Sequence, residues 1–388
     1  MNTPDTGSFG QEEIQASREV RYRVDKGSVS GIYSSRLSES IKASIRQVIR
    51  ITRSDPFLLI TATRLLSVQK RAAARREALA TEGLQVPPVV MFSLTHQCNL
   101  ACHGCYMRSL HRAETPEMTS DQLMDLVSEC VDLGVSFLVM AGGEPLVRRN
   151  EILMLARAYP DLIFAIFTNG LLVDESLATE FGKLPNIVPI LSIEGTEEMT
   201  DSRRREGTYE AVLLALSLLK KHHIFFGCSV TVTRENYPDV TGDQFIQEMI
   251  VHGCRLFAYV EYVPIDEGTR GLLISDEQRS DLNRYLSGFS DQYPALFIGF
   301  PGDEENFGGC LSAGRGFIHI NPSGDLEPCP AAPFSDVNVT RVSLRDALGS
   351  DFLARIRSNH EMLTESGGGC ALWTNRKWVS SLLTERKI

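Results

Sequence analysis

The chain has 388 residues, 43% of them hydrophobic and 23% charged, and its formal net charge is −10. These values suit a soluble globular protein of one large domain and a smaller appendage. The acidic balance argues against a nucleic-acid partner. No apolar run approaches the ~20 residues of a membrane-spanning helix, so a cytoplasmic protein is expected.

The N-terminal region predicts an arm followed by a helical extension. Residues 1–34 are polar and aperiodic, as in a mobile arm, and residues 35–86 show helical spacing, with Asp55 and Pro56 opening a second helix. Residues 36–77 carry ten Lys or Arg against three Asp or Glu. Two interpretations stay open: a helical cap on the fold with solvated arginines, or peripheral contact with a membrane surface or an acidic partner.

From Val89 onward, expected strands alternate with helices. The six strands are Val89–Leu94, Val135–Met140, Leu162–Thr168, Ile187–Ser192, Phe225–Val232 and Leu256–Val263. Six successive βα units predict a parallel α/β sheet with right-handed crossovers, although periodicity alone does not distinguish an open sheet from a barrel. Residues 266–304 then predict a connecting helix and a strand, and residues 305–388 a region rich in Gly and Pro with a hairpin turn.

A cysteine-rich loop follows the first of these strands. Cys98, Cys102 and Cys105 have C-x3-C-x2-C spacing, which allows each thiolate to bind one iron of a cubane cluster. The fourth iron would then lack a protein ligand and could coordinate a substrate. A zinc site usually draws four ligands from paired motifs, and the sequence offers no paired CxxC or HxxxH. Because disulfides are rare in cytoplasmic proteins, metal binding is the favoured interpretation.

The second strand runs into Ala141-Gly142-Gly143-Glu144-Pro145. Two glycines allow close approach of the backbone to a ligand, and a carboxylate can accept a hydrogen bond from an ammonium group. Together with the cysteine loop, this motif resembles the radical S-adenosylmethionine (SAM) enzymes across Val89–Val263. The resemblance implies a partial (β/α)6 TIM-like barrel over residues 87–265. It also implies a [4Fe–4S] cluster on the three cysteines, with SAM bound to its open iron.

The resemblance further implies which residues bind the cofactor. Tyr106 would lie near the adenine, Gly142, Gly143, Glu144 and Pro145 at the methionine amino group, Asn169, Ser192 and Glu194 at the ribose and carboxylate, and Arg204 at the carboxylate. Two candidate catalytic residues, Glu261 and Tyr262, end the sixth strand. There they are expected at the mouth of the barrel, where they could contact the substrate or move a proton.

A second set of cysteines lies near the C-terminus. Cys310 and Cys329 bracket Gly324 as C-x13-G-x4-C, and Cys370 follows three glycines. This pattern resembles the auxiliary-cluster extension called SPASM, or its shorter form, twitch. The resemblance implies a small α+β domain over residues 305–388 that holds a second iron–sulfur cluster. The alternative is that Cys310 and Cys329 only pack a hairpin.

The function that the resemblance implies is reductive cleavage of SAM to methionine and a 5′-deoxyadenosyl radical. This radical abstracts hydrogen from an unreactive C–H bond, and the auxiliary cluster assists the oxidation or rearrangement, as in an oxidoreductase or lyase. The implied partners are a reductant such as flavodoxin or ferredoxin and a small-molecule, lipid or peptide substrate. The alternative is a non-catalytic iron–sulfur redox or electron-transfer protein. Cobalamin-dependent methyl transfer would usually need an additional cofactor domain, and neither the length of the chain nor its motifs indicate one.

Overall fold

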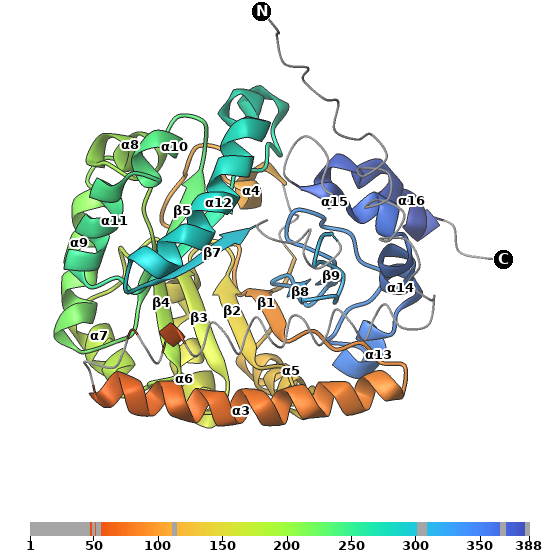
Figure 1. Ribbon diagram of the computed structural model, residues 1–388. Helices are drawn as coiled ribbons and strands as arrows, with labels where there is room; N and C mark the ends of the chain where they lie inside the picture. Colours follow the sequence, from red (N-terminus) through yellow and green to blue (C-terminus); the bar gives the residue numbers. More distant parts are fainter. Residues whose placement is uncertain are drawn as a thin grey trace, which may run out of the picture.

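The computed structural model describes residues 47–48, 51, 56–110, 115–300, 309–364 and 370–384. The predicted arm, residues 1–34, lies outside this part of the chain. A nine-stranded sheet has the order β7-β6-β5-β4-β3-β2-β1-β8-β9 and curls into a partial barrel (Figure 1). All neighbouring strands are parallel except β8 and β9. The predicted α/β partial barrel is therefore confirmed.

The six predicted strands all form. The strands of the sheet are β1 Val89–Ser93, β2 Phe137–Ala141, β3 Ile163–Thr168, β4 Ile187–Ser192, β5 Gly227–Val232, β6 Leu256–Glu261, β7 Leu296–Phe300, β8 Phe317–Ile320 and β9 Leu326–Glu327. The strand that was expected as a connection, β7, pairs with β6 and extends the barrel. The C-terminal hairpin β8–β9 also joins the same sheet, because β8 pairs with β1.

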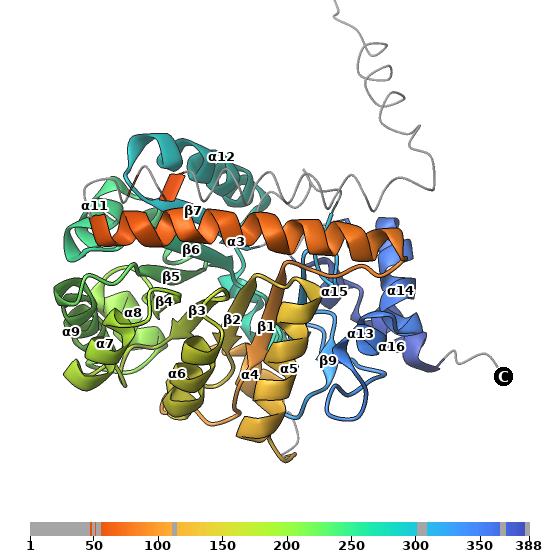
Figure 2. The ribbon, with the colours of Figure 1, turned by 90° about the horizontal axis from the view of Figure 1, so that it is seen from below.

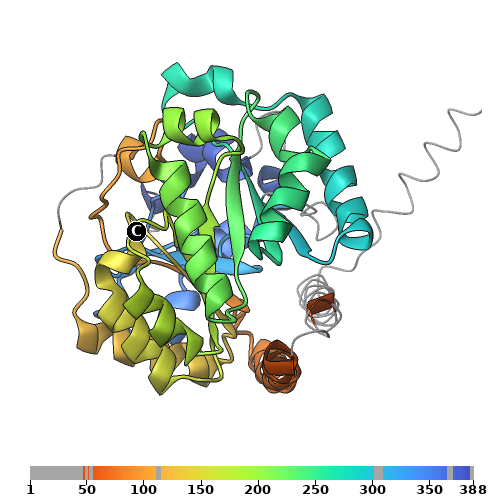
Figure 3. The same cartoon turned by 90° about the vertical axis from the view of Figure 1, so that its left-hand side faces the viewer.

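Helices cover the outer face of the sheet (Figure 3). The helices of the described residues are α3 Pro56–Thr81, α4 Tyr106–Ser109, α5 Ser120–Leu133, η3 Pro145–Arg148, α6 Arg149–Ala158, α7 Glu175–Gly182, α8 Glu197–Arg203, α9 Thr208–Lys221, α10 Tyr237–Val240, α11 Asp243–His252, η4 Glu267–Leu272, α12 Asp276–Gln292, α13 Leu344–Leu348, α14 Asp351–Ser358, η6 His360–Leu363, α15 Ala371–Thr374 and α16 Arg376–Thr384. Thr119 and Gln122 form the predicted capping box of α5. None of the described helices is both long and apolar enough to span a membrane.

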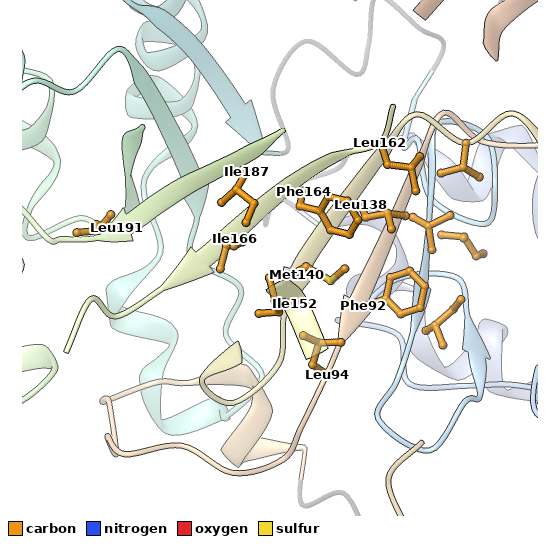
Figure 4. Close-up of a cluster of buried hydrophobic side chains, with 14 of the residues drawn as sticks. Phe92, Leu94, Leu138, Met140, Ile152, Leu162, Phe164, Ile166, Ile187 and Leu191 are labelled. Carbon is orange, nitrogen blue, oxygen red and sulfur yellow. The ribbon is translucent and has the colours of Figure 1, made fainter. Parts of the chain in front are cut away.

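The two faces of the sheet bury different side chains. Leu138, Met140, Phe164 and Ile166 alternate along β2 and β3 and are buried in the core that the sheet forms with its helices (Figure 4). Side chains at the intervening positions point inward. With inward side chains of the other strands they form a second cluster, which includes Ile163, Val188, Ile190, Leu256, Ala258 and Leu296. This alternation follows from the two-residue period of a strand. Cys130, Cys228 and Cys254 are fully buried in the outer core, as expected for structural thiols.

Part of the N-terminal extension packs into the barrel. Ile51 is buried in the inner cluster and Val48 packs against it, while Gln47 Nε2 donates to the carbonyl oxygen of Ser290 at 3.0 Å. The helix α3 crosses the side of the molecule near α5 (Figure 2). One of its basic residues, Arg76, is buried and donates to Gly134 O at 2.5 Å, and burial lowers its pKa to about 10. These contacts favour the interpretation of this segment as a cap on the fold.

Candidate active site

The three cysteines of the first motif lie in one loop at the carboxyl end of β1. Cys98 is exposed, and Cys102 and Cys105 are partly buried. The loop is compact, since Cys105 N donates to Cys102 O at 3.3 Å and His103 N donates to Arg203 O at 2.8 Å. Among the described residues, no three His, Cys, Asp or Glu side chains converge as ligands of one metal ion. Ligands of three different irons in a cubane need no such convergence, so the arrangement is compatible with a cluster.

The two glycines of the second motif contact the chain that enters the cysteine loop. Gly143 N donates to Thr95 O at 2.7 Å, and Glu144 N donates to Gln97 O at 2.8 Å. A Cβ atom on Gly143 would lie only 2.1 Å from Gln97 O. Gly142, with φ +127°, would place a Cβ atom 2.7 Å from Thr95 O. Neither position can accept a side chain without moving the loop, so glycine here sets the position of the cysteines.

The carboxylate of Glu144 is buried at the foot of this loop. It accepts hydrogen bonds from Leu146 N at 3.0 Å, from Thr168 Oγ1 at 2.7 Å and from Asn169 N at 2.8 Å. Burial raises the pKa of Glu144, and the three hydrogen bonds oppose that rise. Asn169 Nδ2 in turn donates to Asn99 Oδ1, in the cysteine loop, at 2.6 Å. The structure thus brings Glu144, at the end of β2, and Asn169, at the end of β3, together at the loop.

Glu194 and Arg204 form an ion pair beside the cluster loop. Glu194 is 1% exposed and accepts from Arg204 Nη2 at 2.5 Å and from Arg203 Nη1 at 2.5 Å. Arg204 Nη1 lies 4.0 Å from the sulfur of Cys102. Burial lowers the pKa of Arg204, but the charge and hydrogen bond of Glu194, together with the nearby thiols of Cys102 and Cys105, outweigh it and the pKa is raised. Arg203 was not identified from the sequence, although it adjoins Arg204 in a run of three arginines.

The remaining predicted residues have different surroundings. Ser192 points inward, and its Oγ lies 3.3 Å from Ser229 Oγ on β5. Tyr106 begins α4 directly after Cys105. Tyr262 is buried under the cysteine loop: a Cβ atom on Gly104 would lie 2.5 Å from its hydroxyl oxygen, and that hydroxyl donates to Thr269 Oγ1 at 2.6 Å. Tyr262 therefore supports the loop.

Glu261 lies on the outer face of the sheet. Its neighbours on the same face of β6, Phe257 and Tyr259, belong to the outer core, whereas Leu256 and Ala258 face inward. Its carboxylate forms an ion pair with Arg279 of α12, whose Nε donates to both oxygens at 3.0 Å. A catalytic role for Glu261 stays a prediction, and the ion pair gives this residue a structural role.

A buried polar chain that was not identified from the sequence links β1 to the C-terminal hairpin. His319 Nε2 lies 2.8 Å from Ser93 Oγ, and His319 Nδ1 lies 2.7 Å from Glu327 Oε2. All three residues are at most 2% exposed. Asn321 Nδ2 completes the chain by donating to Glu327 Oε1 at 2.9 Å. A signal was present in the sequence, since a histidine within the apolar strand Phe317–Ile320 needs a partner when it is buried.

The C-terminal cysteines lie on segments that contact one another. Ala313 N, three residues after Cys310, donates to Pro328 O at 3.0 Å, next to Cys329. Cys310 N donates at 2.9 Å to the carbonyl of Leu363, at the end of η6, and η6 packs against α15, which Cys370 precedes. Arg315 Nη1 also donates to Cys310 O at 2.7 Å. The fold therefore brings the segments that carry the three cysteines into contact, and a cluster held by these cysteines stays a prediction.

These features define the class of protein. The model of the radical SAM superfamily matches residues 92–243, a span from β1 into α11 that contains the cysteine loop, the two glycines and Glu194. The match identifies residues 92–243 as a radical SAM domain. The family uses a [4Fe–4S] cluster and SAM, and the predicted cofactors are confirmed at this level. The donor set also fits them, because three thiols share one loop with a buried arginine beside Cys102.

Several characterised proteins are similar to this chain. The mycofactocin maturase MftC of Mycolicibacterium smegmatis is 27% identical over 64% of this chain, and AlbA of Bacillus subtilis, a protein of subtilosin bacteriocin biosynthesis, is 27% identical over 74%. The chain covers 66% of each of these relatives, just under two thirds. The AdoMet-dependent heme synthase of Methanosarcina barkeri is 24% identical over 72% of this chain and 88% of that protein.

The solved structures support the fold. Streptococcus suis SuiB bound to S-adenosylmethionine superimposes with a TM-score of 0.61 at 18% identity, over 79% of this chain and 76% of that chain. SuiB bound to its precursor peptide SuiA gives a TM-score of 0.59 at 19% identity, over 79% of this chain and 74% of that chain. At these identities the similarity shows the architecture, and that architecture extends past the radical SAM domain.

Proposed function

We propose that this protein is a radical SAM enzyme that modifies a peptide, with a second iron–sulfur cluster in its C-terminal region. The observation that carries the proposal is the loop of Cys98, Cys102 and Cys105, held at the carboxyl end of β1 by the Gly142–Gly143 contact. Support for a peptide substrate comes from the similarity to MftC and AlbA and from the shared fold of SuiB, whose structure contains a precursor peptide.

The residues of the first site would act by positioning. When bound, the cluster supplies one electron to the sulfonium of SAM, which releases methionine and a 5′-deoxyadenosyl radical. Arg204 places a guanidinium beside Cys102, where it can pair with a carboxylate, and Glu194 orients it. Tyr262 and the two glycines hold the loop in place. Glu144 and Asn169 connect β2 and β3 to the loop, so that the site is built on rigid strand ends.

The auxiliary cluster is assigned to Cys310, Cys329 and Cys370. With three thiolates, one iron would be held by another residue or would be open to the substrate. A cluster in this place could accept the electron that the substrate radical loses and so give net oxidation. The electron that starts the reaction would come from a reduced flavodoxin or ferredoxin.

The test is formation of 5′-deoxyadenosine by anaerobically reconstituted, dithionite-reduced protein. The wild type should convert SAM to 5′-deoxyadenosine and methionine, while a Cys98→Ala, Cys102→Ala, Cys105→Ala triple variant should not. A Cys130→Ala variant controls for loss of a buried thiol. Iron and sulfide contents of both variants and of a Cys310→Ala, Cys329→Ala variant would count the clusters. A wild type that binds iron and sulfide yet never cleaves SAM would instead be an electron carrier or redox sensor.

A tetrapyrrole is the second candidate substrate. It is favoured by the similarity to the AdoMet-dependent heme synthase, of which the chain covers 88%. The two candidates differ in charge, because a coproporphyrin carries several carboxylates whereas a peptide can present a neutral side chain. Incubation with each, followed by mass spectrometry of the substrate, would separate them.

A further inference from the structure

The strands of the barrel carry few charged side chains on their inner face, where Glu327 of β9 is buried against His319. Strands β1 to β8 contain a single Asp, Glu, Lys or Arg, namely Glu261, and this residue lies on the outer face, paired with Arg279. Few polar side chains point inward, and most of them contact one another. Ser192 lies beside Ser229, and His319 is held between Ser93 and Glu327. A charged group that entered the barrel would find no exposed counter-ion on the described strands, because Glu327 is 2% exposed and is paired with His319.

The exposure of the inward-facing side chains changes along the strands. At the end where the strands begin, Ile163, Val188, Leu256 and Leu296 are buried, together with Ile51 of the N-terminal segment. Further along, the inward apolar side chains are only partly buried: Met91, Val139, Phe167, Val260 and Ile298, with Phe300 44% exposed. Among the described residues, Ile51 and Val48 thus cover one end of the inner face, and the part that the described residues leave more exposed faces the end that carries the cysteine loop.

Apolar residues on an uncovered sheet face are typical of a binding surface. These six side chains come from β1, β2, β3, β6 and β7, so the partly exposed apolar surface extends over five strands of the curled sheet. The polar and charged groups at the strand ends belong to the cofactor site, where Arg204 is paired with Glu194. The strands themselves therefore offer hydrophobic contact and little else.

We propose that this inner face binds an uncharged, apolar side chain of the peptide substrate, aliphatic or aromatic, and that the C–H bond attacked belongs to that side chain. The inference rests on the proposed function for the identity of the substrate as a peptide. In the step itself, one hydrogen atom passes from the side-chain carbon to C5′ of the 5′-deoxyadenosyl radical. The products are 5′-deoxyadenosine and a carbon-centred radical on the peptide, so that atoms and electrons balance.

The lack of exposed charge on the inner face of the barrel distinguishes between substrate classes. A porphyrin with carboxylates or a lipid with a phosphate would have to leave its charges unpaired against the strands, at a large cost in desolvation. A leucine-like or phenylalanine-like side chain loses only its contact with water, which is favourable. A peptide can keep its polar backbone outside the barrel while one side chain enters.

The binding test uses Nile red, a neutral apolar fluorophore, and SAM-loaded holoenzyme under anaerobic conditions. Val260→Asp puts a charge on the inner face, and Val251→Asp is the matched control, because Val251 is 71% exposed on α11. Nile red should bind the wild type and the control equally and bind Val260→Asp at least tenfold more weakly. Equal binding to all three proteins, or no binding to the wild type, overturns the proposal. Should Val260→Asp lose its iron or its circular dichroism spectrum, Val260→Thr replaces it, with a threefold or greater weakening expected.

The selectivity test uses competitors of Nile red. Hexapeptides with identical neutral flanks and a central Leu, Phe, Glu or Lys are compared with coproporphyrin III. Displacement by the Leu and Phe peptides at tenfold lower concentrations than by the others supports the proposal, and stronger displacement by the charged peptides or the porphyrin overturns it. Formation of 5′-deoxyadenosine by the wild type without added substrate is measured separately. If it is absent while Nile red binding behaves as expected, the proposed function fails and the assignment of the apolar face stands.

Discussion

Replacing Gly143 with alanine is the sharpest test of how the cluster loop is held. A Cβ atom on this residue would lie 2.1 Å from the carbonyl oxygen of Gln97, and this neighbour is backbone, which cannot rotate away. Gly143 is not among the glycines with positive φ, so backbone strain is not the issue. The clash alone must push the entrance of the cysteine loop away from the end of β2.

The size of the effect follows from the geometry. A contact of about 3.0 Å requires the two segments to separate by roughly 0.9 Å, starting from 2.1 Å. That movement would stretch the 2.7 Å bond from Gly143 N to Thr95 O and the 2.8 Å bond from Glu144 N to Gln97 O beyond normal range. Two lost hydrogen bonds at about 1 kcal/mol each, with about 1 kcal/mol of overpacking, give a destabilisation of about 3 kcal/mol.

The assay compares the iron and sulfide contents and the thermal unfolding of Gly143→Ala with those of Gly288→Ala. Gly288 lies in the helix α12 with no atom within 4 Å of its virtual Cβ, so the control should gain about 0.5–1 kcal/mol. We expect Gly143→Ala to unfold at a lower temperature and to bind less iron than the wild type. A Gly143→Ala protein with full iron content and wild-type stability would refute the view that this contact positions the cysteines.

Three further substitutions probe other contacts. Glu194→Ala would leave two arginines buried without their carboxylate and should cost about 3–5 kcal/mol in denaturant unfolding, more than Glu194→Gln; equal effects would contradict a charge-based role. His319→Ala should cost about 3 kcal/mol by leaving Glu327 buried without its partner, and a second substitution, Glu327→Gln, should recover part of the loss. Burial raises the pKa of Tyr209 to about 12, helped by its bond to Glu248. In the unfolded chain this phenol ionises near pH 10, so the wild type should lose stability between pH 10 and 12, and Tyr209→Phe should lose less. Urea unfolding at pH 8 and 10.5 is the measurement. A difference in free energy of unfolding between the two proteins that is the same at both pH values would contradict this.

The strands of the barrel were predictable because each is an apolar run with a turn signal at its end. The expected strand Val89–Leu94 corresponds to Val89–Ser93, and Ile187–Ser192 was predicted without error. The pairing of β8 with β1 was not predictable. These strands are parallel neighbours from opposite ends of the chain, and a local pattern of hydrophobic residues carries no information about which distant strand completes a sheet.

The candidate site was predictable to a different extent at each residue. The spacing of the cysteines fixed the loop, since ligands in a short segment cannot be far apart. The face of the sheet on which Glu261 lies is set by the alternation of side chains along β6. Glu261 is an even number of residues from Phe257 and Tyr259, and this spacing was the signal in the sequence that it faces the helices. Arg279, its partner, lies on a helix that no motif connects to the strand. Pairing of this kind follows from tertiary packing and not from the sequence around either residue.

The central position of β1 explains why the two cysteine sites act as parts of one structure. On one side β1 pairs with β2, whose end carries Gly143, and on the other with β8, whose hairpin leads to Cys329. The chain from Ser93 through His319 to Glu327 crosses the second of these pairings. A shift of the hairpin would therefore move β1 and the loop that follows it. Substitution of His319 should accordingly alter the spectrum of the cluster at Cys98, Cys102 and Cys105, although none of these cysteines is touched.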